Sequence, residues 1–251
     1  MRFAHVINPF ICDETNKSYL YYAQPITFKT MLNSKLEAQK HNIDVKLYCA
    51  IFEEDEKIVP DYFIKLPYLN KSTMNVFPRH CKKKKLPFLQ EIFDKMLKIE
   101  ADYFVFTNVD IALQKNFYIR LKYIIENNSS SFAINRRDNI PKFINNKRLT
   151  HNDLDILYQQ KGEKHPGIDT FIIKREILEK INMGKLFTGY PPWGSVLSFY
   201  LKKLDTSYKI FKNEYLTFHI GKDNDWWDKT DKLFYKNKKE GKKIKKYIKS
   251  L

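Results

Sequence analysis

The sequence has 251 residues, 43% of them hydrophobic, which suffices for the core of one α/β domain or of a domain with a small appendage. Only seven glycines are present, and neither GxGxxG nor GxxxxGK(S/T) occurs, so the two commonest nucleotide-binding fingerprints are excluded. Three widely separated cysteines without a CxxC pair give no metal framework, and no apolar run approaches the roughly 20 residues that span a bilayer. We therefore expect a cytoplasmic protein.

The N-terminal third alternates strand and helix patterns. Short apolar runs predict strands over residues 2–11, 45–52 and 62–66, and apolar spacing predicts a helix over residues 24–41. The first strand ends in Asn8, Pro9 and Phe10. Such a βαβ opening favours a sheet with parallel strands covered by helices.

A compact basic loop at residues 79–87 precedes an amphipathic helix that begins at Pro87. The loop contains Arg79 and four consecutive lysines. A basic loop at a helix N-terminus can bind a diphosphate. A solvated run of lysines is the alternative explanation.

A strand is predicted over residues 103–107, and the first candidate functional residues follow it. It is apolar, aromatic and β-branched, which is typical of a strand buried on both faces. Asn108 and Asp110 follow it, and ligands of open α/β sheets bind just beyond the carboxyl ends of strands. Asp110 is therefore the first candidate for a functional carboxylate. The alternative is that both side chains only form a turn and cap the next helix.

Further polar groups lie beside apolar runs in the second half. The patterns predict helices over residues 117–127, 153–160, 177–181 and 195–204, strands over 130–134, 170–173 and 214–220, and a polar loop over 139–151. Arg136 and Arg137 follow the first of these strands, and arginine pairs suit phosphate because guanidinium groups bind it bidentately. Asp169 stands at the start of the second strand, behind Gly167, where a carboxylate is expected to be paired or functional. His219 lies near the end of the third.

The net charge of +16 is concentrated at the C-terminus. Residues 229–251 contain ten lysines against Asp231 and Glu240, with apolar and aromatic residues between them. Such a segment can lie on an anionic membrane surface or bind nucleic acid. The alternative is a solvated, lysine-rich tail.

Five motifs resemble those of GT-A glycosyltransferases: FVFTNVDI, FAINRRDN, HPGIDTFIIKRE, FTGYPPWGSVL and LTFHIG. They occur in this order between residues 101 and 221, and the INPF strand with its following helix extends the similarity to the N-terminus. The chain is similar to a family-2-like group with TNxDI or SNxDI in place of DxD. The resemblance implies a single GT-A, Rossmann-like α/β domain over residues 1–225, with a mixed, mostly parallel central sheet flanked by helices. Residues 226–251 would form a basic, aromatic-containing tail.

The resemblance also implies roles for individual residues. Asp110 matches the last Asp of DxD and His219 a C-terminal His, and the two would bind Mn²⁺ or Mg²⁺. Asp169 would be the base of an inverting reaction, or else a carboxylate bonded to nearby backbone amides. The residues assigned to the nucleotide-sugar donor are Asn8, Pro9, Arg79, Asn108, Asp110, Arg136 and Arg137. Those assigned to the acceptor are His165 and Trp193, the latter as a platform under a sugar ring or as a core residue.

The implied function is metal-dependent transfer of a sugar from a nucleotide-diphosphate donor to a glycan or glycolipid acceptor, such as a surface polysaccharide, lipooligosaccharide or glycoprotein. The basic tail would then contact the inner face of an anionic membrane. Two departures from the family pattern leave open a catalytically inactive GT-A-like binding domain: Asn108 replaces the first Asp of DxD, and Gly194 replaces an Asp that follows the Trp.

Two other classes of protein are alternatives. A nucleotidyltransferase also needs a metal-binding carboxylate at a strand end. A nucleic-acid-binding protein would explain the positive charge, but no helix-turn-helix, zinc or RNP pattern occurs, which argues against a nucleic-acid partner.

Overall fold

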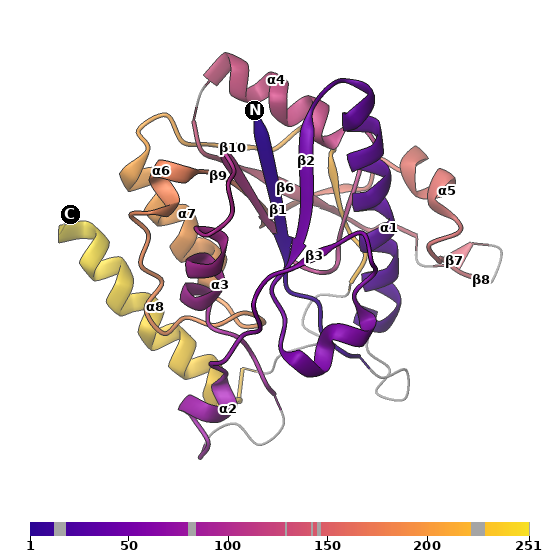
Figure 1. Ribbon diagram of the computed structural model, residues 1–251. Coiled ribbons are helices and arrows are strands. Elements are labelled where there is room, and N and C mark those ends of the chain that lie inside the picture. Colours follow the sequence, from indigo (N-terminus) through magenta and orange to yellow (C-terminus); the bar gives the residue numbers. More distant parts are fainter. Residues whose placement is uncertain are drawn as a thin grey trace.

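A curled, mixed sheet of nine strands forms the centre of the protein (Figure 1). The computed structural model describes residues 1–12, 19–79, 84–128, 130–141, 143–144, 147–221 and 229–250. The sheet has the order β3-β2-β1-β4-β9-β6-β11-β5, with β10 also paired to β6. Its strands are β1 (Arg2–Ile7), β2 (Asp44–Cys49), β3 (Ile64–Lys65), β4 (Tyr103–Thr107), β5 (Ile111–Leu113), β6 (Phe132–Asp138), β9 (Glu163–Lys174), β10 (Lys209–Phe211) and β11 (Thr217–His219). A separate hairpin consists of β7 (Phe143–Ile144) and β8 (Lys147–Arg148).

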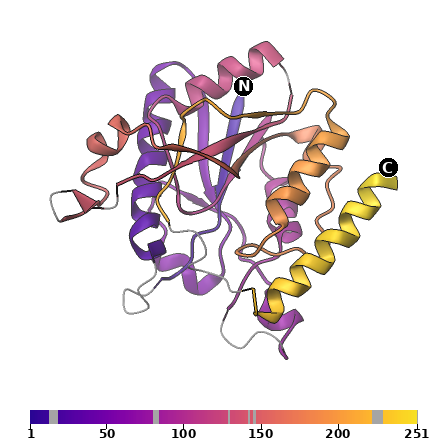
Figure 2. The same cartoon turned by 180° about the vertical axis from the view of Figure 1, so that it is seen from behind.

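Helices cover both faces of the sheet, which gives three layers (Figure 2). The helices are α1 (Tyr19–Lys40), η2 (Glu53–Ile58), α2 (Thr73–Val76), α3 (Leu89–Met96), α4 (Phe117–Asn128), α5 (Leu154–Gln159), α6 (Arg175–Leu178), α7 (Trp193–Leu204) and α8 (Lys232–Ser250). On one face, α1 and α4 bury residues such as Met31 and Leu121 against the sheet. On the other, α3 and α7 bury residues such as Phe93 and Leu197, and α8 packs outside α7.

The strand directions bring four strand ends to one edge of the sheet. β1, β2, β3 and β4 are parallel, and β9 runs antiparallel to both of its neighbours, β4 and β6. β6 therefore points the same way as β4, and β11 is parallel to β6. The carboxyl ends of β1, β4, β6 and β11 consequently lie together, at the edge where side chains can form a site.

A buried histidine ties two central strands to a helix just below this edge. Nδ1 of His5, on β1, lies 2.7 Å from the Tyr118 hydroxyl on α4, and Nε2 lies 2.9 Å from Oγ1 of Thr107, the last residue of β4. Burial lowers the pKa of His5 to about 3, so the ring is neutral. These bonds fix the end of β4, immediately before Asn108.

The second half of the sheet differs from the sequence prediction in several strands. β5 and β10 were not predicted, and β11 is shorter than the predicted strand over residues 214–220. β6 continues to Asp138 and does not end at residue 134, so Arg136 and Arg137 lie within the strand. β9 begins at Glu163, which places Asp169 in mid-strand and not at a strand start. The polar C-terminal half of β6 pairs with the polar N-terminal half of β9, with shifts in register between them. This backbone pairing keeps both segments extended, although neither has the apolar pattern of a buried strand. The predicted loop at 139–151 contains the hairpin of β7 and β8.

The lysine-rich C-terminal segment forms a helix that packs on the domain. Leu233, Asn237, Gly241, Ile244 and Ile248 are buried on the inner side of α8. Its outer side carries lysines that are exposed: Lys232, Lys238, Lys239, Lys242, Lys243, Lys246 and Lys249. The predicted boundary at residue 225 falls within 222–228, outside the described residues. None of the helices in the described ranges is both long and apolar enough to cross a membrane.

Candidate functional site

A cavity of about 630 Å³ opens at the edge of the sheet where β1, β4, β6 and β11 end. Residues 84–87 and residues 188–195, which run into the first turn of α7, form other parts of its wall. Apolar side chains such as Phe10 and Phe52 line it together with several carboxylate, amide and basic groups. This volume and this mixed lining are typical of a small-molecule site.

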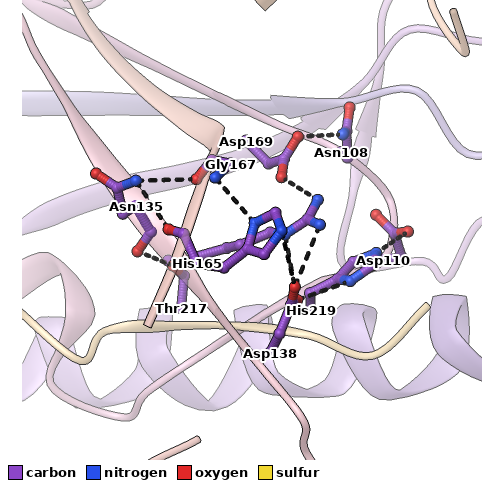
Figure 3. Close-up of polar contacts among 10 residues, drawn as sticks. Asn108, Asp110, Asn135, Asp138, His165, Gly167, Asp169, Thr217 and His219 are labelled. Atoms are coloured by element: carbon purple, nitrogen blue, oxygen red, sulfur yellow. Dashed lines mark hydrogen bonds and ion pairs between the residues drawn. The ribbon is translucent and has the colours of Figure 1, made fainter. Parts of the chain in front are cut away.

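Asp110 and His219 are brought together by the pairing of two short strands. β5 begins one residue after Asp110 and runs antiparallel to β11, so that Ile111 lies opposite His219. The carbonyl of Asp110 also accepts a hydrogen bond of 2.9 Å from the backbone N–H of Ile220. As a result, Oδ2 of Asp110 lies 3.1 Å from Nε2 of His219 (Figure 3).

These two side chains suit a divalent cation. Neighbouring ligands of an octahedral ion with bonds of about 2.1 Å lie roughly 3 Å apart, which matches the 3.1 Å between Asp110 and His219. A Cβ atom at Gly221 would collide with Asp110 Oδ2 and lie 3.0 Å from His219 Nε2, so glycine keeps the space beside both atoms open. Within the described ranges, no group of three or more His, Cys, Asp or Glu side chains could hold a metal. Other coordination positions would therefore be filled by a bound ligand or water.

His219 lies between two carboxylates, because its Nδ1 is 3.0 Å from Oδ1 of Asp138. Burial acts to lower the pKa of His219, but the hydrogen bonds to Asp110 and Asp138 outweigh it and raise the pKa to about 9. The ring is therefore protonated at neutral pH when no metal is bound. A cation and a proton would compete for Nε2.

Asp169 is held by two donors at the same edge. Its Oδ1 accepts a 2.9 Å hydrogen bond from Nδ2 of Asn108, and its Oδ2 accepts a 2.7 Å bond from Nη1 of Arg136. Burial raises the pKa of Asp169 even though the positive charge of Arg136 acts to lower it. The amide at position 108 thus stabilises Asp169, whereas a second carboxylate there would repel it.

Arg136 connects Asp169 to the pair formed by Asp110 and His219. Its side chain is 9% exposed, and its Nε lies 3.2 Å from Oδ1 of Asp138. A continuous chain of polar contacts therefore runs across the site, through Asn108, Asp169, Arg136, Asp138, His219 and Asp110.

Seven of the predicted site residues line the cavity: Asn8, Asn108, Asp110, Arg136, Asp169, Trp193 and His219. Four other predicted site residues do not line the cavity in the part of the chain that the structure describes: Pro9, Arg79, Arg137 and His165. Pro9 is buried and Arg79 is exposed in a turn. From the basic loop, Lys84 and Lys85 line the cavity, while residues 80–83 lie outside the described residues.

Arg137 and His165 occupy positions behind the cavity wall. Arg137 is 2% exposed, and its guanidinium lies 3.3 Å from the ring centre of Tyr215. It follows Arg136 directly, and successive side chains of a strand point to opposite faces. Nε2 of His165 lies 3.5 Å from Oδ2 of Asp138, so His165 contacts the site through Asp138.

Trp193, the first residue of α7, is mainly a core residue. It is 7% exposed, and its ring centroid lies 5.7 Å from that of Phe106 and 5.8 Å from that of Phe171. Part of its surface nevertheless lines the cavity. The side chain can therefore form an apolar patch of the wall while it anchors α7 to the sheet.

Two residues that lie beside the pair of Asp110 and His219, Asp138 and Gly221, were assigned no role from the sequence. Asp138 stands two residues after Arg136, so a prediction that extended the strand would have placed both on one face. Gly221 was visible only as the last letter of LTFHIG. Its role depends on the distance between two other side chains, which no local pattern encodes.

Comparison with known proteins identifies the fold. No protein-family model and no curated protein matches the sequence. Among solved structures, S. aureus TarS 1-349 in complex with UDP-GlcNAc aligns with a TM-score of 0.53 and 12% identity, over 97% of this chain and 66% of that chain. The mannosyltransferase PcManGT from Pyrobaculum calidifontis, in complex with GDP-Man and Mn²⁺, aligns with a TM-score of 0.50 and 10% identity, over 90% and 58%. The chain has the GT-A glycosyltransferase fold.

The fold class predicted from the sequence, a mixed and mostly parallel sheet flanked by helices, is thereby confirmed. At identities of 10% to 12% the likeness establishes the fold alone. The chain spans less than two thirds of the length of either matched chain.

Proposed function

We propose that this GT-A domain is a metal-dependent glycosyltransferase, which moves a sugar from a nucleotide-diphosphate donor to a glycan acceptor. The observation that carries the proposal is the meeting of Asp110 and His219, 3.1 Å apart, on the cavity that Asp169 also lines. When the glycosidic bond breaks, the diphosphate leaving group gains negative charge, which a divalent ion held by Asp110 and His219 would stabilise.

Asp169 would act as the base. As the acceptor oxygen attacks the anomeric carbon, its O–H bond breaks and the proton passes to the Asp169 carboxylate, while the nucleoside diphosphate leaves. Burial raises the pKa of Asp169, which brings it closer to the pH at which a base works best. This direct displacement would invert the anomeric carbon.

Gly194 packs against the strand that carries Asp169. A Cβ atom at Gly194 would lie 3.3 Å from the carbonyl oxygen of Ile168, so Gly194 packs beside the residue that precedes Asp169. The resemblance to GT-A glycosyltransferases implies an Asp at the position of Gly194. In this chain Asp169, on the neighbouring strand β9, would supply the carboxylate.

The ligands of the matched structures support the donor and the cofactor. One holds UDP-GlcNAc, and the other holds GDP-Man and Mn²⁺. We infer a nucleotide sugar as donor here, with Mn²⁺ or Mg²⁺ as cofactor. Residues 188–195, which line the cavity and include Trp193, would bind the glycan or glycolipid acceptor of a surface polysaccharide, lipooligosaccharide or glycoprotein.

Membrane contact through α8 is part of the proposal. The exposed lysines of α8 would attract an anionic surface at roughly 1 kcal/mol each. They would hold the enzyme at the inner membrane face, close to a lipid-linked acceptor.

Thermal unfolding with a panel of nucleotides tests the proposed function. UDP, GDP, CMP, ADP and dTDP are each added with Mn²⁺, Mg²⁺ or EDTA. A ligand at about 100 times its dissociation constant adds roughly 2.7 kcal/mol of stability. We expect one nucleoside diphosphate to raise the midpoint only with metal, and Asp110→Ala to abolish the shift.

Asp94→Ala, at an exposed carboxylate on α3, is the matched control and should keep the shift. If no nucleotide shifts the midpoint of a folded wild-type chain, the glycosyltransferase proposal is wrong. An inactive GT-A-like domain would then be the better account of Asn108 and Gly194.

A further inference from the structure

Asp138 lies at the centre of the polar chain, although it does not belong to the described residues that line the cavity. Its Oδ1 is 3.0 Å from Nδ1 of His219 and 3.2 Å from Nε of Arg136. Its Oδ2 is 3.3 Å from Nη2 of Arg136. The carboxylate is 17% exposed. It therefore contacts two site residues at once from behind the wall.

We propose that Asp138 is a positioning residue that holds the imidazole of His219 in the orientation needed to bind a divalent cation together with Asp110. This inference rests on the proposed function. Asp138 would act through His219, since it is not among the described residues that line the cavity.

The two ring nitrogens of His219 face different partners. Nδ1 faces Asp138, so it carries a hydrogen that the carboxylate accepts, and Nε2 faces Asp110 at 3.1 Å. A histidine ligand that donates its second N–H to a carboxylate has its ring orientation and tautomer fixed, and its basicity rises. Without Asp138 the ring could rotate and turn a carbon atom toward the cation.

The strand geometry explains why Asp138 reaches His219. Arg137 on β6 lies opposite Phe218 on β11, and the two strands are parallel. The next residues along the two strands, Asp138 and His219, are consequently neighbours at the end of the sheet. The extension of β6 beyond residue 134 thus brings the carboxylate to the histidine.

Both partners of Asp138 present N–H groups to its oxygens, Nδ1 in His219 and Nε and Nη2 in Arg136. A carboxylate at this position can accept from both. Arg136 also binds Asp169, so it stays anchored when Asp138 is lost. Removal of Asp138 should therefore weaken metal binding more than it disturbs Asp169.

Mn²⁺ binding to the full chain tests the inference, with free Mn²⁺ followed by electron paramagnetic resonance and no nucleotide present. We expect Asp138→Ala to weaken Mn²⁺ binding roughly 10- to 100-fold. Asp138→Asn should lose less, because an amide oxygen still accepts the Nδ1 hydrogen but carries no charge. The control is Asp102→Ala, which removes a carboxylate paired with Arg2 at the opposite end of the sheet and should leave Mn²⁺ affinity unchanged.

A double-mutant cycle separates positioning from a merely structural role. If Asp138 acts through His219, Asp138→Ala should cause no further loss of Mn²⁺ affinity in a His219→Ala background. A further loss of similar size there would overturn the inference, as would equal Mn²⁺ affinities of the wild type and a folded Asp138→Ala variant.

Thermal unfolding midpoints establish that the variants are folded. If Asp138→Ala does not fold, Asp138→Asn decides, and an unchanged Mn²⁺ affinity in that variant overturns the inference. Failure of the wild-type chain to bind Mn²⁺ would overturn the metal site itself and, with it, the metal dependence of the proposed function. The two failures are therefore distinguishable.

Discussion

At the scale of single residues, Asp169 has the most direct chemical role in the proposed reaction. Asp169→Asn keeps an oxygen for the Asn108 amide but cannot take a proton from the acceptor. We expect kcat to fall by about 10² to 10⁴, the usual contribution of a general base. The metal-dependent thermal shift caused by the nucleotide should remain.

Steady-state kinetics and thermal unfolding of the same preparation check this prediction. Exposed Asp155→Asn, on α5, is the matched control and should have wild-type kcat. An unchanged kcat in Asp169→Asn would show that another group accepts the proton.

His5 links stability to pH. Its pKa is about 3 in the folded chain because of burial, against 6.5 when unfolded, so below pH 6.5 the unfolded chain binds an extra proton. The stabilising contribution of neutral His5 is therefore fully present above pH 6.5 and declines as the pH falls toward 3. At pH 5, which lies 1.5 units below the unfolded-state pKa of 6.5, this one group lowers the free energy of unfolding by about 2 kcal/mol.

Urea unfolding at pH 7.5 and pH 5 measures the loss. The free energy of unfolding of wild type should fall by about 2 kcal/mol more than that of His5→Gln. The exposed His41→Gln variant should behave as wild type. The same fall in wild type and His5→Gln would contradict a neutral, buried His5.

At the scale of elements, Asn237 fastens α8 to the cavity wall. It is fully buried, its Oδ1 accepts a 3.1 Å hydrogen bond from the N–H of Phe187, and its Nδ2 donates a 2.7 Å bond to the carbonyl of Tyr190. Asn237→Ala removes the side chain that bonds both backbone groups, which should cost about 1–3 kcal/mol of unfolding free energy. Lys238→Ala, at the exposed neighbour, should cost less than about 0.5 kcal/mol.

Urea unfolding of both variants tests this role of α8. Equal stability of Asn237→Ala and Lys238→Ala would show that the loop at residues 187–191 does not depend on α8. In that case the C-terminal helix would be an independent appendage, as the predicted division at residue 225 suggested.

The elements also show what the sequence could predict. The bounds of β4 were predicted correctly and those of α4 to within one residue, because continuous apolar runs and helical spacing are local signals. β6 and β9 were placed too short, since their polar halves are extended by pairing with each other. The pairing joins residues about 30 positions apart, which a local pattern does not contain.

The same reason limits the prediction of the site. Asp110 and Asp169 stood out as carboxylates beside apolar runs, and His219 through the resemblance. Asp138 was visible in the FAINRRDN motif but was assigned no role, because its partner His219 lies on β11. Arg137 was assigned together with Arg136, and only the alternation of side chains along an extended β6 separates the two.

At the scale of the whole molecule, positive charge is gathered on the outer face of α8. We expect the chain to bind vesicles that contain anionic phosphatidylserine, and to be released as salt is raised. Lys238→Glu combined with Lys242→Glu should weaken vesicle binding by at least tenfold. Lys29→Glu combined with Lys46→Glu, at exposed lysines on α1 and β2, is the charge-matched control.

Co-sedimentation with vesicles measures this binding. If both double variants lose affinity equally, the attraction comes from net charge and not from α8. Equal affinity for neutral vesicles would contradict an electrostatic contact altogether.

The central claim is that the cavity cleaves the bond between the anomeric carbon and the diphosphate with the help of a metal held by Asp110. The most direct measurement supplies the nucleotide sugar of the stabilising nucleotide, Mn²⁺ and H₂¹⁸O, with water as a slow acceptor, and locates ¹⁸O by mass spectrometry. We predict ¹⁸O in the released sugar, unlabelled nucleoside diphosphate, and no release in EDTA or with Asp110→Ala. Label in a phosphate group would instead indicate nucleotidyl transfer, and release that persists in EDTA would contradict the metal site.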